Sequence, residues 1–553
     1  MKKIIVLTLI GMVLLSSCTA PQPMASPTLA STDVVENTVT AEPSPTVEPA
    51  AVIPLGGSVT RALTSEPTSL DPHGPVGSGQ NVIFPFLFDT LVYRQADNTY
   101  HPYLAESWII ADDGLSVEFK LKAGITFHDS SPLNAEAVQF TFQRLMDLGA
   151  KSPLASGFAS VAAVEAPDDQ TVRVTFTQPS SIFFSTISTP YAGIISPDAV
   201  AVSGENFGQN PVGSGPFKFD SWAPGEAVTL VRNEDYTWGP AVLENQGAAY
   251  LDQVVFKIVP DAAMQATAFQ SGEVDILFIN SPSQIARLKE DPAAQMIETT
   301  LNSLIYLGFN TQKPPFDKIQ VRQAFAYAID KQELVDVALA GIGAAAFSPL
   351  APTLPGFDAS LASLERATDL TKAAELLVEA GYAEQADGSW LGSDGQPLVV
   401  ELIISTRAPN EAIATVLQEQ LKKAGIEITI RALEAAAVSE TTTAGDYQAM
   451  LWRYDWNDAD VLNVYLSTSR IGRTNRSGYS NPQLDGLLEQ ASHELDQAKR
   501  DSLYSQAQVI LMDELPWIPL YTPKDFIVMR SSIEGAKIGP MGRMLLNEAY
   551  LKP

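Results

Sequence analysis

Residues 399–430, VVELIISTRAPNEAIATVLQEQLKKAGIEITI, contain a strand, a helix and a second strand in succession. The first six residues form an apolar run typical of a strand, and every second residue from Ile426 to Ile430 is apolar, as in a half-buried strand. Between them, apolar residues recur at helical spacing from Asn410 and stop at Gly425: Ile413, Val416, Leu417, Leu421 and Ala424. This order favours a βαβ crossover in a partly parallel α/β sheet.

The next strand along the chain is aromatic and leads into an acidic loop, within residues 447–466 (YQAMLWRYDWNDADVLNVYL). Large rings alternate there with charged side chains: Trp452, Arg453, Tyr454, Asp455 and Trp456. Ligands of open α/β sheets gather beyond the carboxyl ends of the strands, where Asp455 would lie. We therefore expect a ligand pocket with ring-lined walls and a few charges. The alternative is an edge strand that packs its rings on a core, with the acidic residues capping a turn.

Patterns of strands and helices continue on both sides of this unit. Residues 107–176 contain short alternating strands and a helix that Asn134 can cap, which predicts a small α+β unit up to about residue 200. Strands and helices alternate again from 217 to 279, which predicts a sheet covered by helices. Trp517 to Met529 is a single long apolar strand pattern.

The composition is that of a large, acidic, globular protein. With 553 residues, the chain exceeds what one hydrophobic core usually supports, so we expect two or three domains. The 35 basic and 64 acidic residues give a net charge of −29, which argues against nucleic acid as a partner because phosphate binding needs a basic face. The single cysteine excludes an intrachain disulfide framework.

The N-terminus is typical of an exported, lipid-anchored protein. A basic start is followed by an apolar run from Ile4 to Leu15, which is too short for a permanent transmembrane helix but suits a secretory signal. The string LSSC resembles the lipobox of bacterial lipoproteins, so we expect a signal peptide over residues 1–17 and lipid on Cys18. Residues 18–54 are rich in Pro, Ser and Thr, which predicts a disordered tether. The alternative is an ordinary signal peptide followed by a chance cysteine.

No motif in the sequence requires an enzyme. There is no G-x-S-x-G, H-E-x-x-H or P-loop, and no lysine has a serine three residues before it. The four histidines are scattered and offer no ligand spacing for a metal. Acidic pairs such as Asp458 with Asp460 could imitate a glycosidase dyad, but they are more typical of a turn or a cap. We therefore expect no catalytic residue, no cofactor and no metal.

Six longer motifs occur in order between about Ser58 and Val528: PTSLDPHG (67–74), FDTLVY (88–93), FKLKAGITFHDSSPLNAEAVQFTFQR (119–144), NPVGSGPFKF (210–219), GFNTQKPPFDKIQVRQAFAYAIDK (308–331) and YSNPQLDGLLEQA (479–491). With these motifs the chain resembles the extracytoplasmic solute-binding proteins of ABC importers, specifically the family 5 group that binds peptides, nickel and oligosaccharides. The resemblance covers essentially the whole body of the chain.

This resemblance implies an α/β fold of the bilobed periplasmic-binding-protein type (type II), with mixed β-sheets flanked by helices and an extra inserted domain. The implied layout has five segments: 55–75, 206–302 and 511–553 for a discontinuous lobe I, 76–205 for the inserted domain, and 303–510 for lobe II. Two segments would be the hinge crossings between the lobes, Leu304 to Phe309 and Pro516 to Tyr521.

The resemblance also implies roles for the aromatic strand. Peptide-binding members carry a strand of the form G-W-x-x-D-Y, whose aspartate pairs with the amino terminus of the ligand, and alignment without gaps places Asp455 on that aspartate. Backbone groups of Leu451 and Arg453 would pair with an extended ligand, in the manner of strand addition. The expected ligand-binding side chains are Trp452, Arg453, Tyr454, Asp455, Trp456 and, just past the 399–404 strand, Arg407.

The implied function is that of a lipoprotein that closes two lobes on a small peptide or peptide-like solute and delivers it to an ABC permease and ATPase complex. We expect a monomer that its lipid anchor holds outside the cytoplasm, in the periplasm or at the outer face of the cell membrane. The same fold could instead bind an oligosaccharide, an opine-like compound or a metal chelate, since aromatic rings suit sugars equally well. A more distant alternative is a secreted surface hydrolase on the same tether.

Overall fold

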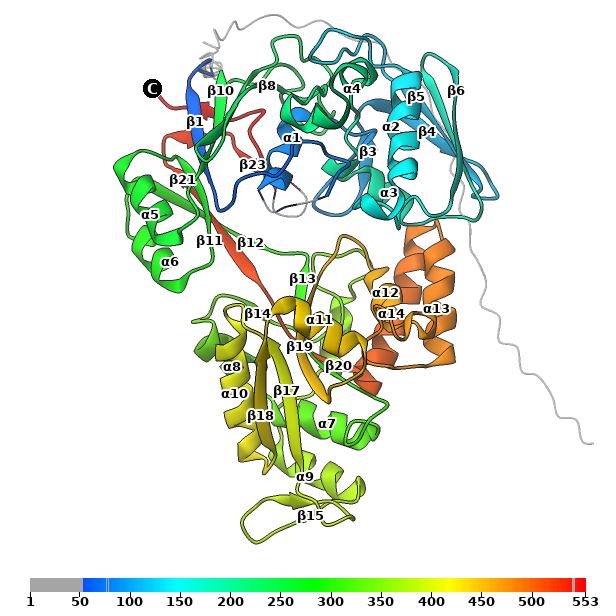
Figure 1. Ribbon diagram of the computed structural model, residues 1–553, viewed down its shortest axis with the longest axis vertical. Coiled ribbons are helices and arrows are strands. Elements are labelled where there is room, and N and C mark those ends of the chain that lie inside the picture. Colours follow the sequence, from blue (N-terminus) through cyan, green and yellow to red (C-terminus); the bar gives the residue numbers. More distant parts are fainter. Residues whose placement is uncertain (1–52, 76, 78, 540–542) are drawn as a thin grey trace, which may run out of the picture. The chain divides into compact units, whose positions relative to one another are not determined.

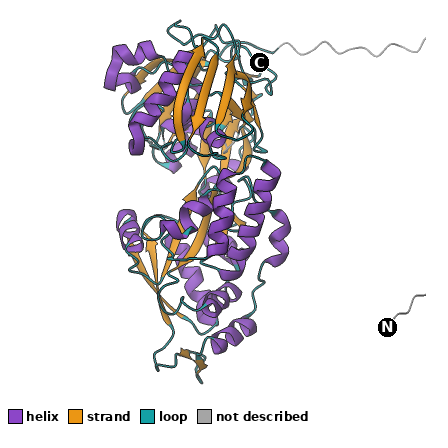
Figure 2. Cartoon of the chain, turned by 90° about the vertical axis from the view of Figure 1, so that its right-hand side faces the viewer, coloured by secondary structure: helices purple, strands orange, loops and turns teal. Residues whose placement is uncertain are grey.

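The computed structural model describes residues 53–553, apart from 76, 78 and 540–542. Residues 53–553 form one compact unit, in which strands gather in three larger sheets and helices lie along the sheet faces (Figure 2). This mixed α/β architecture confirms the expected fold class. Within these described ranges, no helix combines the length and the apolar character that a bilayer crossing requires. The predicted signal peptide, the lipidated Cys18 and nearly all of the tether lie outside the described residues.

The first sheet has seven strands in the order β12-β21-β11-β1-β10-β9-β8. It is mixed, because β1 runs parallel to β10 and β11 whereas β21 runs antiparallel to β11 and β12. The helices α5 (Ala262–Ser271) and α6 (Pro282–Lys289) lie beside β11 and β12 (Figure 1). The strands are β1 (Ser58–Leu63), β8 (Phe217–Ala223), β9 (Ala227–Arg232), β10 (Gln253–Ile258), β11 (Ile276–Ile279), β12 (Ala294–Thr300) and β21 (Lys524–Arg530).

A four-stranded antiparallel sheet is formed by the chain between β1 and β8, inside the predicted insertion of 76–205. Helix α2 (Ala135–Leu148) packs on it through an apolar stripe that includes Val138 and Phe142, and Asn134 caps this helix by accepting a hydrogen bond from the Ala137 N–H, as predicted. The strands are β4 (Ala105–Ile110), β5 (Ser116–Leu121), β6 (Val161–Asp168) and β7 (Thr171–Phe176).

The second large sheet has six strands in the order β14-β20-β13-β19-β17-β18. β17 (Val399–Ser405), α10 (Asn410–Lys423) and β18 (Glu427–Leu433) form the predicted parallel βαβ crossover, and the apolar face of α10 is buried against the sheet. The aromatic strand is β19 (Ala449–Asp455). The remaining strands are β13 (Ser303–Phe309), β14 (Ala344–Ala345) and β20 (Trp517–Thr522).

Two short links carry the chain between the first and second sheets. Residues 301–302 join β12 to β13, and Pro523 joins β20 to β21. The links lie side by side, because the Leu301 N–H donates to the Pro523 carbonyl at 3.1 Å. This arrangement corrects two expectations. The hinge segments predicted at 304–309 and 516–521 are strands within the second sheet, and the return to the first sheet comes at Pro523, well after residue 511.

The single apolar strand predicted from Trp517 to Met529 is therefore two strands in two different sheets. Pro523, which cannot donate a ladder hydrogen bond, is the single residue between β20 and β21.

Shorter elements complete the described part of the chain. Most of the remaining helices pack around the second sheet, and α13 and α14 pack against each other. The helices are α1 (Phe84–Leu87), α3 (Phe183–Ile187), α4 (Pro197–Ser203), α7 (Ile319–Ala328), α8 (Lys331–Ala338), α9 (Leu370–Glu379), α11 (Ala435–Thr443), α12 (Val461–Leu466), α13 (Pro482–His493) and α14 (Gln497–Glu514). The strands are β2 (Val92–Arg94), β3 (Tyr100–Pro102), β15 (Ala383–Glu384), β16 (Trp390–Leu391), β22 (Ile533–Glu534), β23 (Lys537–Ile538), β24 (Met544–Leu545) and β25 (Tyr550–Leu551).

Candidate ligand-binding site

The carboxyl end of β19 lies beside the links between the two sheets. β19 runs parallel to β17 and antiparallel to β13, and its last residue, Asp455, is paired with Ser303 at the start of β13. The following Trp456 donates its backbone N–H to the Asn302 carbonyl at 3.0 Å, within the 301–302 link. The topology therefore brings the predicted acidic residue to the place where the chain changes sheets.

Alternation along β19 separates its charged side chains from its rings. Arg453 and Asp455 lie on one face and form an ion pair, with 2.9 Å between Arg453 Nε and Asp455 Oδ2. The side chains of Arg453 and Asp455 are 44 % and 60 % exposed, so the pair is open to solvent and to a ligand.

Tyr454 lies on the opposite face of β19 and belongs to the core. It is 1 % exposed, and its hydroxyl donates to the Pro349 carbonyl at 3.0 Å and accepts from the Ala351 N–H at 2.9 Å. Trp452 is half-buried against the same cluster, with the Arg476 guanidinium 4.4 Å from the centre of its ring. For Tyr454 and Trp452, the alternative interpretation of the sequence, in which the rings of this strand pack on a core, fits the structure. The buried Tyr454 holds β19 in place.

Three cavities meet along residues 452–457. The central cavity, about 600 Å³, lies against the first sheet; its wall includes Arg61, Phe278, Arg453, Asp455, Asp525 and Arg543. The insertion-side cavity, about 230 Å³, is lined by residues between Pro153 and Tyr191 and by Asp455, Trp456, Asn457, Asp458 and Asp460. The strand-end cavity, about 200 Å³, lies beyond β17 and is lined by Arg407, Leu451, Trp452, Arg453 and Tyr521, among others. Asp455 and Trp456 border the first two cavities, and Arg453 borders the first and third.

Five of the six predicted side chains therefore border a cavity. Arg407, which follows β17, shares the strand-end cavity with Trp452 and Arg453, whereas Asp455 and Trp456 border the other two cavities. Tyr454 is absent from all three walls, because its side chain is turned to the core.

The backbone of Arg453 faces the strand-end cavity. Trp456 donates its N–H to Asn302, and Gln448 accepts from the Asn310 N–H at 2.9 Å, so even-numbered residues of this strand bond towards β13. In an antiparallel ladder the intervening odd-numbered residues point their N–H and C=O groups the other way. On that side β17 is paired only with Ala449 and Met450, which leaves the Arg453 backbone without a strand partner. This is the geometry that strand addition needs.

The acidic loop after β19 is fixed by a buried ion pair. Asp458 and Arg500 are each 5 % exposed, with 3.1 Å between Arg500 Nη1 and Asp458 Oδ2. Burial alone would raise the pKa of Asp458, but the Arg500 charge outweighs it and holds that pKa below its ordinary value. Asp458 also accepts the Asp460 N–H at 2.9 Å. This acidic pair thus caps a turn, in agreement with the structural interpretation of the sequence.

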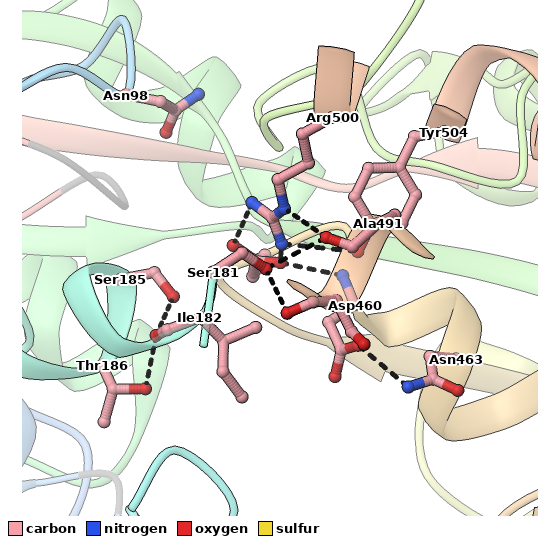
Figure 3. Close-up of polar contacts among 12 residues, drawn as sticks. Asn98, Ser181, Ile182, Ser185, Thr186, Asp460, Asn463, Ala491, Arg500 and Tyr504 are labelled. Atoms are coloured by element: carbon pink, nitrogen blue, oxygen red, sulfur yellow. Dashed lines mark hydrogen bonds and ion pairs between the residues drawn. The ribbon is translucent and has the colours of Figure 1, made fainter. Parts of the chain in front are cut away.

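Asp460 is the acid of this loop with a strongly perturbed pKa. Burial, together with the nearby Asp458 charge, raises the pKa of Asp460 to about 7, although Asn463 donates to it at 3.1 Å. Figure 3 shows Asp460 and Asn463 beside Arg500, close to the point where Ser181 donates its hydroxyl to the Ala491 carbonyl at 3.1 Å. The loop therefore lies where the inserted segment contacts α13.

Sequence reasoning missed three charged residues of the central cavity, namely Arg61, Asp525 and Arg543. They come from β1, β21 and the C-terminal segment, so no local motif connects them. The one signal available was an arginine inside an otherwise apolar strand pattern, at Arg61. In the described part of the chain, no group of three or more His, Cys, Asp or Glu side chains is placed to hold a metal ion.

Comparison with known proteins identifies the class to which this architecture belongs. Residues 99–474 match the family described as bacterial extracellular solute-binding proteins, family 5 (middle region), and the chain belongs to this family. The resemblance inferred from the six sequence motifs is thereby confirmed.

Three relatives illustrate how far the similarity extends. Heme-binding protein A of Haemophilus influenzae is 31 % identical, over 84 % of this chain and 87 % of its own length. Di/tripeptide-binding protein 4 of Pseudomonas aeruginosa is 31 % identical, over 84 % of this chain and 89 % of its own length. The solved structure of the ABC transporter-associated periplasmic binding protein DppA from Helicobacter pylori, in complex with the peptide STSA, superposes with a TM-score of 0.70 at 28 % identity, covering 90 % of this chain and 99 % of that one.

Proposed function

We propose that this solute-binding protein captures a small peptide or peptide-like zwitterion at the carboxyl end of β19 and passes it to an ABC permease and ATPase complex. The observation that carries the proposal is the open Arg453–Asp455 pair at the junction of three cavities. An ammonium group of the ligand would bond Asp455, and an acceptor of the ligand would bond Arg453. Each contact replaces part of the internal ion pair with a charge-assisted hydrogen bond.

The free backbone edge of β19 supports an extended ligand. Arg453 offers an N–H and a C=O beside the strand-end cavity, and both groups gain a partner when a peptide adds as a strand. Trp452 and Arg407 line the same cavity and would contact side chains of that ligand. A sugar or a metal chelate could stack on the rings but would leave this backbone edge unused, so the geometry favours a peptide over these alternatives.

Several of the relatives are peptide-binding proteins by name, which supports a peptide-like ligand. They include di/tripeptide-binding and glutathione-binding proteins, and solved structures of relatives hold a tetrapeptide and a nonapeptide. The mechanism that we propose is hinge closure about residues 301–302 and Pro523, with no bond made or broken in the ligand. We accordingly propose a transport component rather than a hydrolase.

Mass spectrometry of the solute that co-purifies with the native protein tests this proposal directly. We expect short peptides or peptide-like molecules with a free amine, and calorimetry with the synthetic compound should reproduce the binding. A sugar, a chelate or a compound without an amine would overturn the peptide assignment. Turnover of the bound molecule would overturn the transport role.

We further propose that Cys18 is lipidated after removal of residues 1–17, and that the protein is membrane-anchored as a monomer outside the cytoplasm. The basic start, the apolar run and the LSSC string support this. In cell fractionation, the wild type should sediment with membranes and be released by detergent, whereas Cys18→Ser should be soluble or unprocessed. Thr19→Ala is the matched control and should stay with the membrane. Membrane retention of Cys18→Ser at the wild-type level would contradict the anchor.

A further inference from the structure

We propose that Arg61 and Arg543 form an anion subsite in the central cavity, which receives a carboxylate group of the bound solute. The inference rests on the proposed function for its premise that the central cavity holds the ligand. It adds the ligand chemistry: besides an amine for Asp455, the solute carries a carboxylate that two arginines recognise.

Arg61 is a buried cation without an anion. It is 3 % exposed, and its Nε has no hydrogen-bond partner. Its guanidinium lies 4.3 Å from the centre of the Phe278 ring, which occupies one face of the group and leaves the in-plane N–H donors available. Among the described residues, no carboxylate comes within ion-pair distance of it. Burying an unpaired charge is costly, so such a group in a cavity wall indicates a partner that arrives with the ligand.

Arg543 adds a second cation to the same wall. It follows the first sheet in the chain and borders the central cavity with Arg61. In the described ranges, it too forms no ion pair. Burial lowers the pKa of Arg61 to about 9 and that of Arg543 to about 10, as expected where solvent is displaced and no carboxylate compensates. Both groups nevertheless remain cations at neutral pH.

The acids of the central cavity are not available to neutralise these arginines. Asp455 is paired with Arg453. Burial raises the pKa of Asp525, and the cation whose charge opposes this rise is Arg453 rather than Arg61 or Arg543. The cavity therefore offers separate positions for the two charges of a zwitterion.

A carboxylate fits the two arginines better than other acceptors do. The planar guanidinium presents N–H donors in a fork that matches two carboxylate oxygens, and charge-assisted bonds of this kind are about twice as strong as neutral ones. The carboxylate can be a C-terminal group or an acidic side chain. Both groups are carboxylates, which the arginines select. The experiment distinguishes a C-terminal carboxylate from an acidic side chain.

The test uses the mature protein and the variants Arg61→Gln and Arg543→Gln. Lys218→Gln is the matched control, because it removes a cation from the same sheet. Lys218 is paired with Asp235 at 3.2 Å and borders none of the three cavities. Calorimetry compares trialanine with trialanine amide, and Ala-Glu-Ala amide with Ala-Gln-Ala amide. In wild type and in the control, we expect the carboxylate-bearing peptide of one pair to bind at least tenfold more tightly than its counterpart without that carboxylate. This ratio corresponds to about 1.4 kcal/mol.

In Arg61→Gln and Arg543→Gln we expect this acid preference to fall below threefold. The first pair of probes reports a C-terminal carboxylate, and the second reports an acidic side chain. Unaltered preference in both variants, with melting temperatures within a few degrees of wild type, would overturn the subsite.

A second measurement keeps the subsite testable if none of these peptides binds. Melting temperatures are recorded with sodium citrate and with sodium chloride at equal ionic strength. Citrate should raise the melting temperature of wild type and of Lys218→Gln more than chloride does, and this difference should shrink in both arginine variants. A citrate effect that depends on the two arginines, without binding of these four peptides, would retain the anion subsite and exclude these peptides as ligands; the peptide assignment itself is decided by the co-purified solute. Kosmotropic anions also stabilise folded proteins in general, so a citrate–chloride difference of the same size in wild type and in both arginine variants would refute the subsite.

Discussion

Single residues at the end of β19 have opposite roles because neighbouring side chains of a strand face opposite ways. Asp455 and Arg453 remain open to solvent, while Tyr454 between them is anchored in the core by two hydrogen bonds to the 349–351 segment. The core residue holds the strand, and the strand in turn positions the charged pair. Function at this scale depends on the face that each residue occupies rather than on residue type alone.

Replacing Asp455 tests the ammonium contact. Asp455→Asn should weaken binding of the co-purified solute by about 1.5–3 kcal/mol, the usual contribution of a hydrogen bond to a charged group. Calorimetry measures the change. Asp446→Asn is the control, since Asp446 is 81 % exposed and lies before β19. Equal dissociation constants for wild type and Asp455→Asn would remove Asp455 from the site.

Replacing Asp460 tests the raised pKa in the acidic loop. Because the folded state raises the pKa of Asp460 from 3.8 to about 7, the unfolded chain releases this proton first, and stability falls as pH rises between about 4 and 7. Asp460→Asn lacks this loss, so it should be more stable than wild type at pH 8, by about 2–4 kcal/mol, and show no such advantage at pH 4. Urea unfolding at both pH values measures the difference. An advantage that does not change with pH would contradict this explanation.

At the scale of elements, local sequence signals explain the helices and the βαβ unit. The cap at Asn134 and the apolar spacing of α10 each involve residues within a few positions of one another, so they can be read without knowledge of the fold. The partition of 517–529 into β20 and β21 could not be read in this way. Both strands are apolar, and only their pairing partners, β13 for one and β11 with β12 for the other, distinguish them.

Removing the cap of α2 tests the element scale. Asn134→Ala should destabilise the protein by about 0.5–2 kcal/mol, because the Ala137 N–H loses its acceptor. Gln143→Ala on the exposed face of α2 is the control and should change stability by less than about 0.5 kcal/mol. Denaturant unfolding measures both. A smaller effect for Asn134→Ala than for the control would show that the cap does not stabilise the helix.

At the scale of the whole molecule, the two sheets are connected through residues 301–302 and Pro523, next to the candidate site. Links this short concentrate any rotation of one sheet against the other in a few backbone dihedral angles. Arg453 and Arg61 line the central cavity together with Asp455, so a ligand bound as we propose would contact both sides of the proposed hinge.

Binding should therefore make the molecule more compact. We expect the radius of gyration from small-angle X-ray scattering to decrease when the co-purified solute is added to ligand-free protein. At a solute concentration that saturates wild type but not Asp455→Asn, the variant should show a smaller decrease. An unchanged radius at demonstrated saturation would contradict hinge closure.

The sequence by itself determined the class of fold, the family, the βαβ unit and the acidic, aromatic strand that ends at Asp455, because periodicity, caps and ordered motifs are properties of neighbouring residues. The tertiary structure alone decided that Tyr454 is a core residue, that β20 and β21 belong to different sheets, and that Arg61, Asp525 and Arg543 share one cavity. These features depend on contacts between segments that are far apart in the sequence. No local pattern encodes such contacts, because the free energy of burial and charge pairing is fixed only when the distant segments meet.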